Sequence, residues 1–196
     1  MHVSAAAAFG DYSMKTNRDV ALSGGDEYNA SFNAQSYSAR LESGYHIALS
    51  PLTLTPYAAL QVQDFEAPSY SETAVHGAKA FALNYNSQNA TDTRFELGAW
   101  ADKTFAMPDG NAVKLFGRLA WAHDWQNNSA IEASFIGLPT AAFAVNGARP
   151  APNQALVTGG VEWRLAKDWT LTAKLDGEFG QGSHTYAATG RLSYAW

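Results

Sequence analysis

Hydrophobic and polar residues alternate along most of this chain with a period of two, which is typical of β-strands that have one apolar face. The pattern is clear near the C-terminus, where Tyr186, Leu192 and Tyr194 occupy even positions and polar residues lie between them. The same alternation recurs at residues 37–47, 54–63, 94–102, 113–121, 157–165 and 169–179, and more weakly at 1–12, 77–86 and 139–148. The pattern predicts about ten strands and no helix.

The composition shows that little of this surface is charged. Only 16% of the 196 residues are Asp, Glu, Lys or Arg, whereas soluble domains usually have about a quarter. No stretch approaches the roughly 18 consecutive apolar residues of a membrane-spanning helix. The net charge of −5 argues against a nucleic-acid partner, and the absence of cysteine excludes disulfides and thiolate chemistry.

The polar face separates the two folds that the alternation allows, a sandwich with its apolar faces inside and a barrel with its apolar face outside. Arginine alternates with carboxylates on this face, which suits a confined and partly wet interior where paired charges limit desolvation. The basic members are Arg40, Arg94, Lys114, Arg118, Arg164, Lys174 and Arg191, and the acidic members are Glu42, Glu96, Asp102, Glu162, Asp176 and Glu178. We therefore predict an all-β fold, an antiparallel up-and-down transmembrane β-barrel.

Aromatic residues near the strand ends support this interpretation. They lie mainly on the apolar parity, as in the interfacial girdles of membrane barrels. The set is Tyr45, Phe105, Trp121, Trp125, Trp163, Trp169, Phe179, Tyr186, Tyr194 and Trp196.

Loop lengths predict the orientation, because membrane barrels have short periplasmic turns and longer external loops. The short links at 49–51 and 166–168 would be periplasmic, and the polar connections at 13–27 and 66–76 external. Residues 126–138 would then form an unusually long inner connection. Ala30, Phe32 and Ala34 are out of phase with the residues from Tyr37 onward, which predicts a bulge near residues 35–36.

Several stretches in this order resemble the C-terminal translocator barrel of Gram-negative autotransporters (type V secretion). They are residues 55–61, 94–98, 117–124, 143–148 and 190–196, and the resemblance covers roughly residues 30–196. It implies a twelve-stranded barrel that anchors a secreted passenger in the outer membrane and takes part in moving it to the cell surface. Family members also carry a helical linker inside the barrel. Since we find about ten strands and no linker or passenger, we expect residues 1–196 to be the C-terminal portion of such a barrel domain.

The resemblance also assigns candidate site residues and partners. The alternating C-terminal strand, with Tyr186, Leu192, Tyr194 and Trp196, is similar to the signal recognised by the outer-membrane barrel assembly machinery. Lumen charges could contact the linker or passenger, or could form a purely structural ion-pair lattice. These candidates are Arg40, Glu42, Arg94, Glu96, Arg118, Glu162, Arg164, Lys174, Asp176, Glu178 and Arg191. Outer-membrane lipid is the remaining expected partner.

The sequence contains no convincing catalytic or cofactor motif. His123 and Asp124 are adjacent in a strand, so their side chains point to opposite faces and cannot form a dyad. The five histidines lack metal-ligand spacing, and no glycine-rich loop precedes a helix. We expect a non-enzymatic protein without cofactors. The alternative is a complete ten-stranded outer-membrane barrel that acts as a small pore or a surface protease.

Overall fold

The computed structural model describes residues 1–21, 25–108, 110–126, 130–147, 151–165 and 168–195. Almost all of its regular structure is β, as predicted. The elements are β1 (His2–Val20), β2 (Asp26–Gly44), β3 (Ile47–Leu49), β4 (Leu52–Ala67), β5 (Tyr70–Ser71), β6 (Thr73–His76), the 3₁₀ turn η1 (Lys79–Phe81), β7 (Leu83–Tyr85), β8 (Gln88–Ala106), β9 (Ala112–Gln126), β10 (Ala130–Phe135), β11 (Leu138–Asn146), β12 (Asn153–Arg164), β13 (Trp169–Gly180) and β14 (Ser183–Tyr194). No helix in the described part of the chain is long and apolar enough to cross a membrane.

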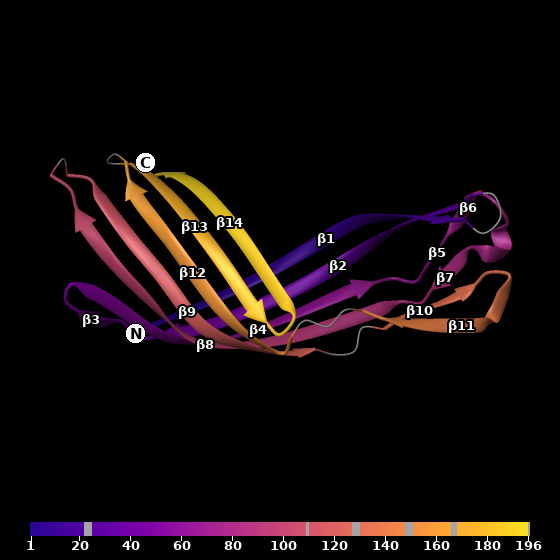
Figure 1. Ribbon diagram of the computed structural model, residues 1–196, viewed down its shortest axis with the longest axis horizontal. Helices are drawn as coiled ribbons and strands as arrows, with labels where there is room; N and C mark the ends of the chain where they lie inside the picture. The colour runs from indigo at the N-terminus through magenta and orange to yellow at the C-terminus, as the bar shows by residue number, and fades with distance from the viewer. Residues whose placement is uncertain (22–24, 109, 127–129, 148–150, 166–167, 196) are drawn as a thin grey trace.

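Antiparallel pairing builds a curled main sheet of ten strands (Figure 1). Its continuous path runs β1-β2-β4-β8-β9-β12-β13-β14, and the short strands β3 and β6 pair with β4 and β2. Among the described residues, β1 and β14 lie at the two ends of this path and are not paired with each other. The sheet is therefore an open half-barrel.

A second sheet, in the order β11-β10-β7-β5, lies beyond one end of the half-barrel. Together with the distal halves of β1 and β2 it forms an extension, seen on the right of Figure 1. The runs expected at 77–86 and 139–148 are found here, as η1 with β7 and as β11, and not among the strands of the main sheet.

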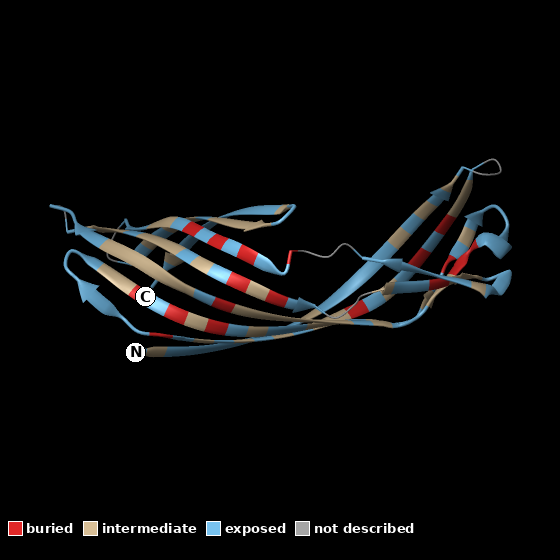
Figure 2. Cartoon of the chain, turned by 60° about the horizontal axis from the view of Figure 1, so that its bottom comes forward, coloured by how far each residue is buried: buried red, intermediate tan, exposed pale blue. Residues whose placement is uncertain are grey.

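Apolar side chains cover the outer face of the half-barrel, because odd and even residues of a strand point to opposite sides. Leu119 and Leu175 are 68% and 67% exposed, while their inward neighbours Arg118 and Asp176 are partly buried. Buried positions alternate with exposed ones along the strands in Figure 2. The predicted outward apolar face and inward charged face are both observed.

Aromatic side chains bound this apolar surface on both sides. On β9, Val113 pairs with Phe105 and Trp163 at one end, and Trp121 lies eight residues further along. Eight residues span about 27 Å of strand, or about 20 Å along the membrane normal at the usual barrel tilt. This height is comparable to the lipid-facing band of about 25 Å in outer-membrane barrels.

The bulge expected near residues 35–36 is absent from β2. Its pairing with β1 is unbroken from Asp26 to Gly44, and its pairing with β4 runs without a shift from Gln35. What changes is the chemistry of the two faces. Near the short-turn end, the inward side of β2 carries the charged residue Arg40. In the extension, where the second sheet faces β2, the same side carries buried Tyr28, Ala30 and Ala34.

This exchange of the apolar and polar faces explains why the prediction of a polar external connection at residues 13–27 was wrong in part. Residues 13–20 and 26–27 continue β1 and β2, and they read as a polar loop because their outward side chains face water. The 126–138 prediction was also wrong. β10 lies within this segment, and the whole 127–152 connection joins the same end of the sheet as the 21–25 and 68–87 connections. It is therefore one of the long loops.

The opposite end carries short turns, as expected. Leu49 pairs with Leu52 across a two-residue turn, and the Leu165 amide donates to the Trp169 carbonyl at 3.0 Å. Residues 166 and 167 of the second predicted turn lie outside the described residues.

Candidate functional site: the charged concave face

Charged residues of the main sheet meet on its concave side. Arg118, Thr158 and Asp176 are cross-strand partners on β9, β12 and β13, so they form one row on one face. The Thr158 hydroxyl donates to Asp176 at 2.7 Å and accepts from Nε of Arg118 at 3.2 Å. Lys174 pairs with the same carboxylate at 2.8 Å. The row is thus tied together across three strands.

Glu96 is the centre of a first ion-pair cluster. It is 4% exposed on β8 and accepts two hydrogen bonds from Arg40 on β2, at 2.8 and 2.9 Å. The hydroxyl of Tyr57 donates to it at 3.1 Å, and Arg118 approaches at 3.4 Å. Arg40 also binds Glu42 at 2.9 Å. Two guanidinium groups and one hydroxyl therefore compensate one buried carboxylate, which is the condition for burying a charge.

Arg94 holds a second cluster near the long-loop end. Its guanidinium donates to Asp124 at 2.6 and 2.8 Å and to Glu178 at 2.8 and 3.3 Å. The side-chain amide of Gln154 donates to Asp124 at 2.9 Å. Asp124 is 5% exposed, so it too is buried with its partners in place.

Three predicted lumen residues remain outside these clusters. Glu162, Arg164 and Arg191 are exposed, and none of them forms an ion pair within the described part of the chain. Arg191 pairs through its backbone with Thr172, an inward residue, which places it on the concave side. The structure brings together Arg40, Glu42, Arg94, Glu96, Arg118, Lys174, Asp176 and Glu178, but not these three.

The predicted assembly-signal residues lie on the opposite, convex face. Tyr186, Leu192 and Tyr194 are 72%, 58% and 50% exposed on β14. The ring of Tyr194 lies 5.0 Å from that of Trp169, and that of Tyr186 lies 5.6 Å from Phe179. Trp196 lies outside the described residues.

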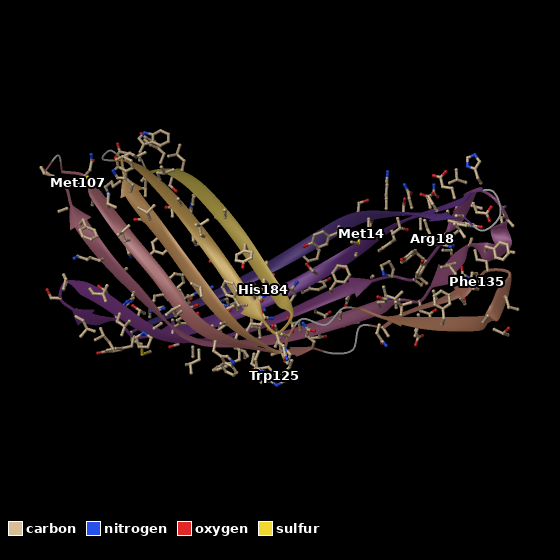
Figure 3. All side chains as sticks on the ribbon, viewed as in Figure 1. Met14, Arg18, Met107, Trp125, Phe135 and His184 are labelled. Carbon is tan, nitrogen blue, oxygen red and sulfur yellow. The ribbon has the colours of Figure 1, made fainter. Side chains whose placement is uncertain are left out.

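The histidine and aspartate at 123 and 124 point to opposite faces, as predicted. His123 contacts Asn153 at 2.9 Å, whereas Asp124 binds Arg94. Trp125, next along the outward parity, projects from the convex side of the sheet in Figure 3. The described residues contain no group of histidines and carboxylates arranged to hold a metal ion.

Two buried acidic residues, Asp124 and Glu72, were not among the predicted lumen charges. Asp124 shares its even parity with Arg118 and could have been found by extending that strand. Glu72 could not, because it lies between two very short strands. It is 5% exposed and accepts two hydrogen bonds from Arg18, at 2.9 and 2.5 Å, inside the extension.

Comparisons with known proteins agree with this architecture. The family model described as "Autotransporter beta-domain" matches residues 1–176. Two proteins from Serratia marcescens, both described as "Extracellular serine protease", are 26% and 25% identical over 169 residues. Each match covers 86% of this chain and 16% of the relative, so the chain spans about a sixth of the length of these relatives.

Proposed function

The chain belongs to the autotransporter β-domain family, whose members form an outer-membrane barrel that translocates a passenger domain, and we propose that its charged concave face lines the path of its own passenger. The proposal rests on the arrangement of charges on the concave face. This face combines buried ion pairs that hold the wall together with exposed charges that point into the hollow.

The two groups of charges have different roles in this proposal. Arg40, Glu96 and Arg94 are saturated by partners, so they stiffen the wall and offer few hydrogen bonds to a moving chain. Glu162, Arg164 and Arg191 are exposed and lie toward the short-turn end. These three contact the linker or the passenger as it enters.

The outer surface has two further proposed partners. Lipid acyl chains cover Leu119, Leu175 and the other apolar residues of the convex face. The assembly machinery recognises the last strand through Tyr186, Leu192, Tyr194 and Trp196.

We further propose that residues 1–196 are the C-terminal portion of one translocator domain and have no catalytic activity of their own. The protease relatives match this chain over only 16% of their length. On the concave face, Glu96 and Asp124 are engaged with arginine, and Asp176 is engaged with lysine. The protease activity named for the relatives is therefore not assigned to this domain.

An export assay tests the role of the exposed charges. An epitope-tagged passenger is placed ahead of residue 1, and surface display is measured by antibody binding and protease accessibility on intact cells. Arg191→Gln, Arg164→Gln and Glu162→Gln should slow display several-fold, because each removes a charge that faces the transit path.

Barrel stability separates this role from a structural one. Because these residues have no ion-pair partners among the described residues, the three variants should keep the wild-type thermal midpoint of the folded band on gels. Glu132→Gln in β10, outside the main sheet, serves as the matched control and should display normally. Normal display by all three single variants would contradict the proposal.

A further inference from the structure

A polar cavity lies between β2 and β4, where these two strands separate. Their pairing ends at Gln35 and Glu66, and β2 next pairs with β6 from Asn29. The cavity at this break has a volume of about 550 Å³, and its lining includes Asn33, Gln35, Glu66, Gln88 and Asn89. This volume is within the range of small-molecule sites.

The register places four of the lining residues on the outward side of the sheet, namely Asn33, Gln35, Glu66 and Asn89, whereas Gln88 pairs with Ala67 on the inward side. Gln35, Glu66 and Asn89 are successive cross-strand partners on β2, β4 and β8, so they form one row on one face. Tyr37 lies on β2 two positions from Gln35, toward the short-turn end. Its ring lies 5.3 Å from the ring of Phe9. Both aromatic rings are exposed outward.

The Phe9–Tyr37 pair marks the edge of the apolar band. On β1 the outward residues before it are Val3, Ala5 and Ala7, and those after it are Asp11 and Ser13. The row at Gln35 therefore lies about 7 Å further along the strand than the last aromatic residues. That position corresponds to the headgroup layer on the long-loop side of the membrane.

Some of the lining groups are held in place, and others are free to bind. Oε1 of Gln35 accepts from the Tyr37 hydroxyl at 2.9 Å, and Nδ2 of Asn89 donates to Asp64 at 3.2 Å. Within the described chain, the side chains of Asn33, Glu66 and Gln88 have no hydrogen-bond partner. The cavity thus offers amide donors, amide acceptors and one carboxylate.

This chemistry matches hydroxyl groups better than it matches phosphate. A hydroxyl both donates and accepts, as an amide does, and a carboxylate accepts from hydroxyls. A phosphate needs cationic or N–H donors, and the lining has one carboxylate and no Lys or Arg. We propose that the cavity binds the neutral saccharide headgroup of a glycolipid in the outer leaflet.

A membrane-bound source is favoured over a free saccharide by the position of the cavity. It opens on the convex face next to the Phe9–Tyr37 pair, where the acyl chains of a glycolipid would lie along the apolar band. A lipid-anchored sugar is then presented at the correct height without a loss of translational freedom. The proposal depends on the outer-membrane location of the chain but not on passenger export, so the display assay above and this test fail independently.

Lipid retention on the full chain tests the proposal. The protein is refolded in bilayers that contain lipopolysaccharide with its neutral core sugars, lipopolysaccharide truncated before those sugars, or phospholipid alone. Retained lipid is measured by native mass spectrometry after detergent extraction. The form with core sugars should be retained about tenfold more than the truncated form, which corresponds to one or two well-formed hydrogen bonds.

Variants connect the retention to this cavity. Gln35→Ala and Glu66→Gln should each reduce retention of the complete form several-fold. Asn17→Ala, an outward amide further along β1, should leave it unchanged. The difference in gel mobility between the folded and the heat-unfolded protein verifies that each variant forms the sheet.

Three results would overturn the assignment. The first is equal retention of the complete and truncated forms, and the second is wild-type retention by both cavity variants. The third is binding of the delipidated core saccharide as tight as that of the glycolipid, because it would show that the lipid anchor contributes nothing.

Discussion

Arg94 on β8 and Glu178 on β13 form a 2.8 Å ion pair although two strands, β9 and β12, lie between them in the sheet. Such a contact is possible only when the sheet curls, because adjacent strands are about 4.8 Å apart and three spacings exceed the reach of the two side chains. The pair therefore reports the curvature of the half-barrel and identifies the charged side as its concave side.

Removing the buried carboxylate of the first cluster should destabilise the sheet. Glu96→Gln removes the carboxylate bonded to Arg118 and leaves Arg40 with Glu42 as its remaining partner among the described residues, and we expect a loss of about 2–4 kcal/mol. Urea unfolding in lipid vesicles, followed by tryptophan fluorescence, measures the change. Asp102→Asn is the control, because the 3.6 Å Lys114–Asp102 pair is longer and more exposed than the Glu96 pairs and should contribute less than about 1 kcal/mol.

Two neighbouring alanines on β14 test which face meets lipid. Ala188 pairs with outward Leu175, whereas Ala187 pairs with inward Asp176. Ala188→Arg should cost about 2–4 kcal/mol, because it places a charge in the apolar band. Ala187→Arg should be nearly neutral, since it lies opposite a carboxylate. Equal effects in bilayer unfolding would contradict the assignment of faces.

The extension should lose stability at acidic pH. Although burial opposes it, hydrogen bonding to Arg18 lowers the pKa of Glu72 below its ordinary value of 4.5. A carboxyl with a lowered folded pKa stabilises the fold above its unfolded pKa and loses that contribution as the pH falls through the folded one. Hydrogen exchange of residues 70–85 should therefore accelerate below about pH 4.5. Glu72→Gln should show the fast exchange at neutral pH and remove this pH dependence.

The same region should weaken again in strong base. Burial, together with the nearby Glu72 charge, raises the pKa of Tyr85 to about 12. A raised folded pKa gives stability that is complete below the unfolded value of about 10 and is lost as the pH rises toward 12. Absorbance of tyrosinate at 295 nm, compared between wild type and Tyr85→Phe, should show one tyrosine that titrates late. An unchanged titration curve would argue against this environment.

Gly98 permits a close approach of β8 and β9 on the concave side. A Cβ atom at this position would lie 2.4 Å from the Cβ of Ala120 and 2.6 Å from the Leu119 carbonyl oxygen. Neither neighbour can rotate away, so Gly98→Ala should destabilise the sheet by about 1–3 kcal/mol. Gly159→Ala, where no atom lies within 4 Å, is the control and should have little effect in the same unfolding assay.

Strand parity predicted most of the candidate site. Arg40, Arg94 and Glu178 were assigned to one polar face from alternation alone, because the two-residue period of a strand is independent of its neighbours. Which of them are partners could not be predicted. Arg40 and Glu96 lie 56 positions apart and belong to strands separated by β4, so the strand order of the sheet brings them together.

The bulge prediction was wrong for a physical reason. Alternation reports which face is apolar, and apolar was equated with outward. The apolar face of a strand points outward only where the outward face contacts lipid. Beyond Tyr37 the outward face meets water and the inner face packs in the extension, where the rings of Phe32 and Tyr70 stack at 4.0 Å. The polarity reverses while the backbone continues in register.

The sequence by itself determined that this chain forms antiparallel strands with one apolar and one charged face, because side-chain alternation is a local property of a strand. The tertiary structure decided which charges meet across the concave side, where β1 and β2 leave the apolar band, and that the 127–152 connection joins the long-loop end. These features depend on curvature and on strand pairing between distant segments, and no local pattern encodes either.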